Sequence, residues 1–209
     1  GTKEGDYYFL NGTKNWITNG SSASVYLVIA QTDASKGHKG ISVFIVEKGW
    51  EGFVIGKKED KLGIRGSDTH SLMFTDVKVP ASNRIGEEGF GFNFAMETLN
   101  GGRIGIAAQA LGIAAGAYEM SVAYSKERKA FGKPISQHQA IQFKLADMAT
   151  QVEAASLLTF KAADLKNRGE KVTLAGAQAK YYASEVAVSV SNEAVQIFGG
   201  YGFTKDYPV

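Results

Sequence analysis

Residues 71–100 read SLMFTDVKVP ASNRIGEEGF GFNFAMETLN, and within them the hydrophobic pattern of the chain changes. Before Pro80, the runs Ser71–Phe74 and Val77–Val79 are rich in β-branched and aromatic residues, as is typical of strands. From Phe90 to about Lys129, Ala, Leu and Met predominate, as is typical of helices. The segment therefore predicts a boundary between a β-rich part and a helical part.

The β-rich part covers residues 1–84, the first of two expected domains. Asn11–Gly12 stands between the β-prone runs Tyr7–Leu10 and Thr13–Thr18. Such a pair predicts a tight hairpin, because a type I′ turn needs positive φ at both central residues. Further β-prone runs follow at Val25–Thr32, Ile41–Glu47 and Phe53–Lys57. Short β-prone runs separated by turn-rich stretches predict an antiparallel β-barrel or sandwich.

The helical part covers residues 85–209 and begins with the long helix expected from Phe90. In a second helix, apolar residues recur at steps of four and three and so share one helical face: Ile141, Leu145, Met148, Val152 and Ala155. A third helix is expected from Thr173, as N-cap, to Phe198, with a left-handed C-terminal cap at Gly199–Gly200. Short connections between such helices predict antiparallel neighbours in a bundle.

Three helices make an incomplete bundle, so a fourth is expected beyond Val209. The chain also opens at Gly1 without Met, almost at once in a strand pattern, and stops just after a helix terminus. We therefore expect an internal piece of a longer protein.

The first long helix is rich in glycine, with Gly101, Gly102, Gly105, Gly112 and Gly116. Each interior glycine costs about 1 kcal/mol relative to Ala. Close approach of another helix or of a ligand would offset that cost, and helix–helix contact is the simpler of the two explanations.

Composition excludes several classes of function. The chain has 209 residues, 23 basic and 21 acidic, and no Cys. A formal charge of +2 gives no field that would recruit nucleic acid, and the absence of Cys removes disulfides and thiolate ligands. His38, His70 and His138 stand far apart, so a metal site is not expected. No apolar run approaches the roughly 18 residues of a membrane span.

Familiar catalytic and nucleotide-binding motifs are absent from the sequence. No Gly-x-Gly-x-x-Gly follows a strand pattern, and there is no Walker-type loop, nucleophile elbow or His-Glu-x-x-His. Rossmann, NTPase and hydrolase interpretations therefore lose their usual support.

Asn15-Trp16-Ile17-Thr18 closes one of the β-prone runs. A strand end at the rim of a small barrel can present an indole face and a hydroxyl to a planar ligand. A Trp packed inside the barrel, with its N–H satisfied, explains the same pattern.

Arg128, Phe131 and Gly132 stand where the first long helix is expected to end, and Gln139 stands near the start of the next. A guanidinium in that position can bind a phosphate through two hydrogen bonds. The alternative is a cation that stabilises the helix C-terminus, with Phe131 as a hydrophobic plug.

The segment Gln196–Gly202, QIFGGYG, contains more glycine than a helix cap needs. Paired glycines let backbone N–H groups approach a ligand closely, whereas a plain helix stop is the alternative.

Taken in order, seven segments resemble the acyl-CoA dehydrogenase family, and the resemblance covers essentially the whole chain. They are LNGTKNWITN (10–19), LGIRGSDT (62–69), VKVP (77–80), GRI (102–104), RKAFG (128–132), QAIQ (139–142) and QIFGGYG (196–202). One such segment can arise by chance, but the ordered set is specific. The short-chain, butyryl-CoA type is the most similar.

The resemblance implies an α+β multidomain protein that binds FAD. An antiparallel β-barrel middle domain would be followed by an antiparallel helical bundle, with a helical domain ahead of Gly1. Trp16, Ile17 and Thr18 match the strand whose indole covers the flavin and whose hydroxyl faces the ring near N5. Further cofactor-binding positions are implied at Arg128, Phe131, Gln139, Gln196, Ile197, Phe198, Gly199 and Gly200. These would reach the pyrophosphate and adenosine end of a neighbouring subunit's FAD.

The resemblance also implies the chemistry. Asn100, Gly101, Gly102 and Arg103 match the segment beside the thioester arm of an acyl-CoA. A carboxylate would remove the α-proton while the β-hydrogen leaves as hydride to the flavin, giving a trans-2-enoyl-CoA. The usual Glu base lies downstream of the glycine loop, beyond Val209, and the less common position, just before Arg103, holds Gly102. No catalytic base is therefore assigned in this chain.

The family implies a homotetramer that passes electrons to an electron-transferring flavoprotein, in a bacterial cytoplasm or a mitochondrial matrix. Two alternatives remain open at this point. One is an acyl-CoA oxidase on the same scaffold, and the other is a non-catalytic relative that serves as an assembly or interaction protein.

Overall fold

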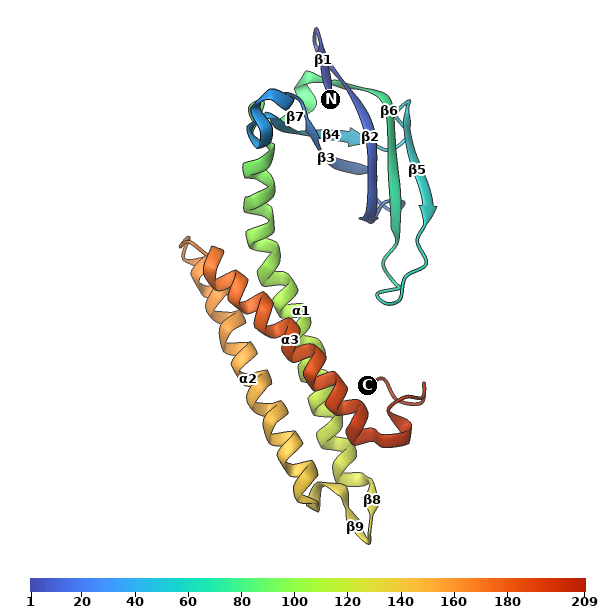
Figure 1. The fold of residues 1–209 in the computed structure, drawn as a ribbon, viewed down its shortest axis with the longest axis vertical. Coiled ribbons are helices and arrows are strands. Elements are labelled where there is room, and N and C mark those ends of the chain that lie inside the picture. Colours follow the sequence, from blue (N-terminus) through green and yellow to red (C-terminus); the bar gives the residue numbers. More distant parts are fainter. The chain divides into compact units, whose positions relative to one another are not determined.

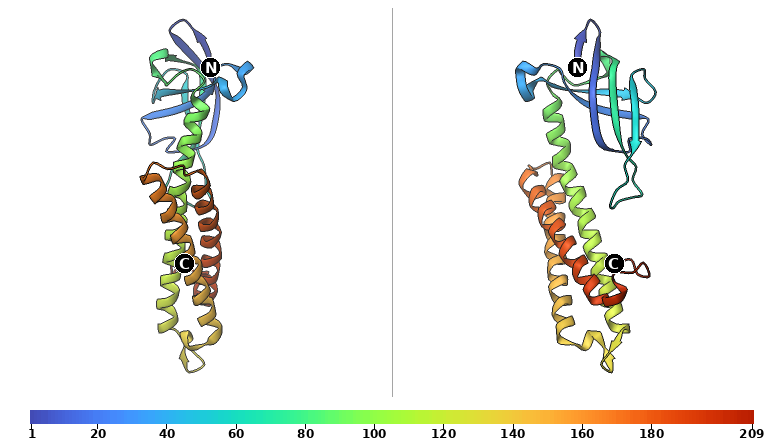
Figure 2. Two further views of the ribbon diagram at one scale, coloured as in Figure 1. Left: turned by 90° about the vertical axis from the view of Figure 1, so that its left-hand side faces the viewer. Right: turned by 45° about the vertical axis from the view of Figure 1, so that its right-hand side comes forward.

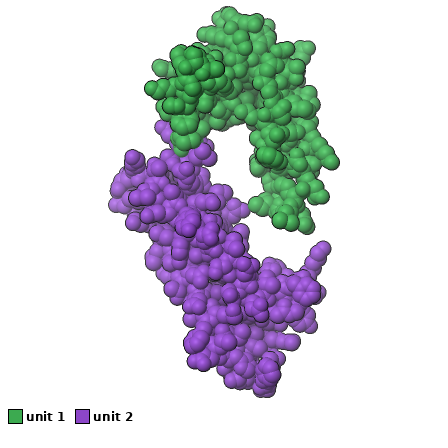
Figure 3. All heavy atoms as spheres, viewed as in Figure 1, with its two compact units in different colours: residues 1–96 green, residues 97–209 purple.

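The computed structural model describes residues 1–209 and separates into two compact units, Gly1–Met96 and Glu97–Val209 (Figures 1 and 3). The first unit contains the strands β1 to β7. The second contains most of the long helix α1 and all of α2 and α3. Each unit has its own hydrophobic core.

The first unit is built from two antiparallel sheets. One has four strands in the order β1-β2-β6-β5, and the other has three in the order β3-β4-β7. The strands are β1 (Thr2–Glu4), β2 (Tyr7–Thr18), β3 (Val25–Gln31), β4 (Ile41–Glu47), β5 (Phe53–Lys58), β6 (Thr69–Pro80) and β7 (Arg84–Ile85). The antiparallel β character predicted for this part is confirmed, and its hydrogen-bonded ladders form two separate sheets.

The core of the first unit follows from alternation along the strands. In β6, Leu72 and Phe74 are buried, whereas Met73 and Thr75 are exposed. Aromatic rings fill the centre: Phe53 stacks on Phe74 at 4.8 Å between ring centroids. A period of two places every second side chain on the same face of a sheet, which is why these residues share one core.

The hairpin predicted at Asn11–Gly12 is wrong, because β2 runs straight through this pair and remains paired with β6. The register shifts by one residue between Leu10 and Gly12, where Gly12 has φ 139°. The Asn11 side chain bonds Asp76 of β6 twice, through Nδ2 to Oδ1 at 2.7 Å and through Oδ1 from the Asp76 N–H at 2.8 Å. The extra residue of the resulting β-bulge is on β6, where Thr75 and Asp76 face Asn11 alone and Asp76 has φ 48°.

The second unit is an antiparallel arrangement of three long helices (Figures 1 and 2). They are α1 (Gly91–Glu127), α2 (Gln139–Asn167) and α3 (Thr173–Phe198). All five apolar residues predicted for one face of α2 belong to the shared core, with Met148 and Ala155 buried. Small residues dominate that core, including Ala107, Ala114 and Ala183, which lets the helices approach closely.

The ends of the third helix were predicted in part. The glycine stop is confirmed, because Gly199 holds the C-cap with φ 58°, but its ψ of −128° is not that of the predicted left-handed cap. Thr173 is not the N-cap: the helix begins at that residue, Val172 holds the cap position, and no side chain caps the helix. The N–H of Gly176 donates to the Val172 carbonyl at 2.8 Å, which extends the helical hydrogen bonding one residue beyond the prediction.

The glycines of α1 do not pack closely within this chain. A Cβ added at Gly102, Gly105, Gly112 or Gly116 would have no neighbour within 4 Å. At Gly101 it would lie 3.0 Å from the flexible end of Lys166. The predicted helix–helix contact at these four positions is therefore wrong for the described chain, because α2 and α3 pack on other faces of α1.

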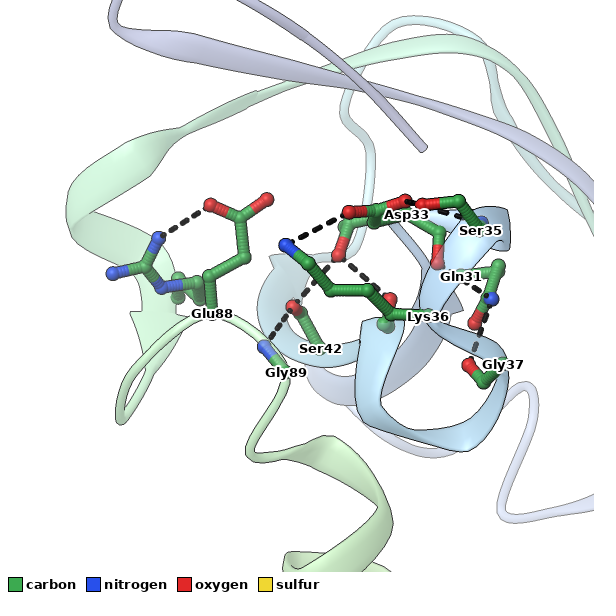
Figure 4. Close-up of polar contacts among 11 residues, drawn as sticks. Gln31, Asp33, Ser35, Lys36, Gly37, Ser42, Glu88 and Gly89 are labelled. Carbon is green, nitrogen blue, oxygen red and sulfur yellow. Dashed lines mark hydrogen bonds and ion pairs between the residues drawn. The ribbon is translucent and has the colours of Figure 1, made fainter.

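The segment that leads into α1 is hydrogen-bonded to β4 beside the 3-10 turn η1 (Ala34–Gly40), as Figure 4 shows. The N–H of Gly89 donates to the Ser42 hydroxyl at 3.1 Å, and Lys36 pairs with Asp33 at 2.8 Å. Hydrogen bonds from Lys36 and Ser35 lower the pKa of Asp33 to about 2. The Gly89–Ser42 hydrogen bond therefore ties the segment before α1 to β4, whereas the Lys36–Asp33 pair stabilises the turn itself.

Helix α1 is the one helix long and apolar enough to cross a membrane by length and composition. This is weak support for a span, since the core helix of a globular domain passes the same test. The sequence-based expectation of no such run treated glycines as interruptions, whereas the Ala, Ile and Leu residues of α1 keep the mean hydropathy of one 18-residue window at 1.2.

Candidate functional site

The end of β2 presents Trp16 to solvent through a second β-bulge. Pairing with β6 runs to Lys14, opposite Leu72, and resumes at Ile17, opposite His70. The two residues between them face a single residue of β6, and Trp16 takes φ 56°. Its side chain is 74% exposed. A Trp packed inside the sheets, the simpler alternative from sequence, is therefore wrong.

Ile17 and Thr18 border a pocket of about 420 Å³ in the first unit. Its walls come from β2, from the following turn, from β3 and from β6, and Lys14 stands at its edge. The Lys14 ammonium donates to the Ile29 carbonyl of β3 at 2.7 Å. Trp16 itself does not line this pocket, and both Trp16 and Thr18 are exposed.

The turn that follows Thr18 is anchored by polar groups. The Tyr26 hydroxyl donates to the carbonyls of Gly20 and Ala23, at 2.8 and 3.0 Å. Asp68 accepts hydrogen bonds from Ser21 and Ser22. The backbone N–H of Ser21 is the largest reason that the pKa of Asp68 lies below its usual value.

A second cluster forms in the other unit, where α1 ends and α3 stops. Arg128 and the glycine loop line one pocket of about 320 Å³, together with Ile197 and Phe198. The guanidinium carbon of Arg128 lies 6.0 Å from the centre of the Tyr201 ring. Five cofactor-binding candidates from sequence are therefore brought together here: Arg128, Ile197, Phe198, Gly199 and Gly200.

Three other candidates do not line this pocket. Phe131 is 96% exposed, on the tight connection between β8 (Lys129–Ala130) and β9 (Lys133–Pro134), and has φ 52°. Gln139 and Gln196 are exposed, at the start of α2 and near the end of α3. The alternative role of Phe131 as a hydrophobic plug is wrong because its side chain is exposed, with the His138 ring 6.0 Å away between centroids.

The substrate-binding candidates lie on one turn of α1. Arg103 donates through Nη1 to the Asn100 side-chain oxygen at 2.6 Å, which holds the guanidinium against the helix. Gly102 is exposed and has open space where a side chain would be. The segment therefore offers an amide, a held cation and an uncovered stretch of backbone.

The structure adds residues that sequence reasoning missed. Tyr124 stacks on Phe198 at 4.1 Å between ring centroids and lines the pocket beside Arg128, as do Tyr201 and Thr204. Nothing in the local pattern marks Tyr124, because it reads as one more apolar residue of α1. Tyr201 lies inside the quoted glycine segment, so its place in that motif was an available signal. Asp68 likewise lies inside a quoted motif.

Comparisons with known proteins match both units. Residues 1–77 match the model of the acyl-CoA dehydrogenase middle domain, and residues 89–209 match that of the acyl-CoA dehydrogenase C-terminal domain. The short-chain-specific acyl-CoA dehydrogenase of Megasphaera elsdenii is 58% identical over 202 residues, 97% of this chain and 53% of the relative. The mitochondrial short-chain-specific enzyme of Mus musculus is 52% identical over 206 residues, 99% of this chain and 50% of the relative.

Comparison with solved structures gives the same family match. The butyryl-CoA dehydrogenase of Megasphaera elsdenii superposes with a TM-score of 0.97 at 58% identity, over 99% of this chain and 54% of that one. A structure from work on the electron transferring flavoprotein of Acidaminococcus fermentans superposes with a TM-score of 0.96 at 57% identity, over 99% of this chain and 55% of that one. The chain thus spans about half the length of the relatives it matches.

Proposed function

Because this chain belongs to the acyl-CoA dehydrogenase family, we propose that the protein containing it is an FAD-dependent dehydrogenase of short-chain acyl-CoA thioesters. The family consists of FAD flavoproteins that act in fatty acid oxidation. Identity of 58% to a short-chain-specific enzyme supports the short-chain preference. The product would be a trans-2-enoyl-CoA.

The bulge at Trp16 is the observation that carries this proposal. A large indole exposed on a left-handed backbone, two residues from an exposed hydroxyl at Thr18, has no packing role within the chain. Bulges often re-aim a side chain next to a functional site. The pair suits a planar heterocycle, with the indole against its face and the hydroxyl at its edge. Bound FAD would supply the hydride acceptor.

The pocket beside Arg128 suits the other end of the same cofactor. A guanidinium can bind a pyrophosphate, the exposed Gly199 and Gly200 leave room beside it, and Tyr201 adds an aromatic face. Phe131, Gln139 and Gln196 are exposed and free to contact an adenosine outside this chain. We assign these groups to the FAD of a neighbouring subunit in a homotetramer, with Trp16, Ile17 and Thr18 serving the chain's own flavin.

Substrate contacts are assigned to Asn100, Gly101, Gly102 and Arg103. The held Arg103 guanidinium is a cation for the acyl-CoA arm, and Gly102 leaves room for the thioester. Gly102 carries no side chain, and from the resemblance to the family we place the carboxylate that takes the α-proton downstream of Val209. The 209-residue chain is accordingly expected to show no turnover with FAD and butyryl-CoA, and turnover above a buffer control would contradict this assignment.

The remaining parts of the proposal concern the domains, the electron acceptor and the cellular compartment. The two sheets of the first unit would be the walls of the family's middle-domain barrel, with domain limits at 1–84 and 85–209. Electrons would pass to an electron-transferring flavoprotein, for which the Acidaminococcus similarity is the support. A bacterial cytoplasm and a mitochondrial matrix both suit the relatives.

One absorbance experiment tests the function. The full-length protein should purify yellow, and butyryl-CoA added without oxygen should bleach the flavin. A colourless protein that takes up no added FAD would refute the proposal. Rapid reoxidation of the bleached flavin by air would identify an oxidase instead. A flavin that no acyl-CoA reduces would indicate a non-catalytic relative.

A further inference from the structure

Asp68, the residue before β6, holds the turn that follows Thr18. Its Oδ2 accepts from the N–H groups of Ser21 and Ser22, at 2.8 and 3.3 Å, and its Oδ1 accepts from the Ser22 hydroxyl at 2.8 Å. Its carbonyl accepts from the N–H of Asn19 at 3.1 Å. One residue therefore gathers four hydrogen bonds from a single turn.

A buried histidine lies next to the Asp68 carboxylate. His70 is 8% exposed, and its Nδ1 lies 2.9 Å from the Gly56 carbonyl. Its Nε2 lies 3.7 Å from Oδ2 of Asp68. The turn also packs closely against His70, because a Cβ added at Gly20 would lie 2.8 Å from the His70 Cβ. The Asp68 carboxylate therefore lies against a packed side chain while it accepts the hydrogen bonds of the turn.

Ile17 and Thr18 lie between two residues with an unusual backbone conformation. Trp16 has φ 56° and Asn19 has φ 60°, so left-handed residues stand on both sides of Ile17 and Thr18. Non-glycine residues stay in that region only where their surroundings fix them. Thr18 pairs with Thr69, the neighbour of Asp68 in sequence. Asp68 is therefore the charged group best placed to fix Thr18.

We propose that Asp68 is a positioning residue of the flavin site, which sets where Thr18 and Trp16 stand against the ring. The inference rests on the proposed function, since it needs a flavin at these two residues. Asp68 itself does not touch the flavin. It acts through the turn Asn19–Ala23, by using both carboxylate oxygens at once.

The test compares matched variants of the full-length protein. Asp68→Asn leaves one acceptor oxygen in place of two, and Ser22→Ala removes only the hydroxyl. Asp76→Asn is the control, because the Asp76 carboxylate lies on β6 and also accepts a hydrogen bond from the β2 side, from the Asn11 side chain. For each variant, FAD affinity, the visible circular dichroism of bound flavin and the melting temperature are measured.

Asp68→Asn should weaken FAD binding by about tenfold and change the flavin spectrum. Ser22→Ala should weaken FAD binding and change the flavin spectrum by a smaller factor. If Asp68→Asn does not fold, the result for Ser22→Ala tests the proposal. Asp76→Asn should leave affinity and spectrum unchanged, even if it lowers the melting temperature.

Two results would overturn the inference. One is an Asp68→Asn protein with unaltered FAD affinity and flavin spectrum. The other is an equal spectral change in Asp76→Asn, which would show general loosening of the sheet instead of positioning. An unmutated protein that binds no FAD would remove this inference together with the proposed function, and it is recognised by the absence of flavin from every variant.

Discussion

At the scale of single residues, two of the cofactor-binding candidates have an unusual backbone conformation. Five residues other than glycine have positive φ, and two of them, Trp16 and Phe131, are cofactor-binding candidates with highly exposed aromatic rings. Positive φ in a bulky residue costs on the order of 1–3 kcal/mol. A ring held outward at that cost, with no partner to bury it, is consistent with a ligand outside the chain.

Thr18→Val tests the hydroxyl assigned to the flavin ring. Valine keeps the shape of the side chain and removes only the hydrogen-bonding group, so FAD binding or the rate of flavin reduction should fall by up to about tenfold, the worth of one hydrogen bond. Stopped-flow reduction by butyryl-CoA measures the second effect. Thr13→Val changes another exposed threonine of β2 and should alter neither quantity.

At the scale of elements, the exposed glycines of α1 lower the stability of the chain, whereas the polar contacts of the turn η1 raise it. Helix α1 keeps glycines that nothing in the chain explains, whereas η1 is tied down by an ion pair and side-chain hydrogen bonds. Each gives a prediction that can be checked on stability alone.

Gly112→Ala should stabilise the 209-residue chain by about 1 kcal/mol, because a Cβ there meets nothing within 4 Å and Ala favours the helix. Urea unfolding measures the difference. Gly202→Ala is the contrast and should destabilise, since its Cβ would collide with the Val195 carbonyl. Destabilisation by Gly112→Ala would instead show that another chain packs against this glycine.

Asp33 makes the stability of η1 dependent on pH. Its pKa in the folded state, about 2, lies below the unfolded value of about 3.9. The contribution of the carboxylate is therefore fully present above about pH 4 and is lost as the pH falls toward 2. The difference in melting temperature between the unmutated protein and Asp33→Asn should shrink over that interval. Lys36→Gln should show the same trend, and a constant difference would contradict it.

At the scale of the whole molecule, the two candidate clusters belong to different compact units. Assigning them to two cofactors makes each FAD a ligand shared between subunits. A ligand bound only by the assembly stabilises it by about 2.7 kcal/mol at a hundredfold excess over its dissociation constant. FAD content and oligomer stability should therefore rise and fall together.

Mixed oligomers test the shared site. Arg128→Gln should weaken FAD binding by about 1.5 to 3 kcal/mol through loss of a charged phosphate contact. Co-expression with Thr18→Val should produce some sites that carry neither lesion, so flavin binding and activity should partly return in the purified mixed species. Lys129→Gln, a neighbouring exposed cation, is the control for charge. Mixed oligomers as impaired as their parents would place both groups at one cofactor within one chain.

The sequence by itself determined what depends on local periodicity and on ordered motifs. The change of pattern near Pro80 gave the β-rich and helical parts, and the spacing of Ile141 to Ala155 gave the core face of α2, because a side chain's face follows from the repeat of its own element. The glycine at position 199 gave the end of α3. The ordered motifs gave the family.

Only the tertiary structure decided what depends on partners distant in the chain. Asn11–Gly12 lies at a bulge instead of a turn because β2 pairs with β6 on both sides of it. A local turn signal cannot predict pairing with a strand more than 60 residues away in the chain. The exposure of Trp16, the pocket that joins Arg128 to Gly199, and the hold of Asp68 on Ser21 likewise arise from contacts between remote segments. Hydrogen bonding and packing across elements, which no local pattern encodes, set these positions.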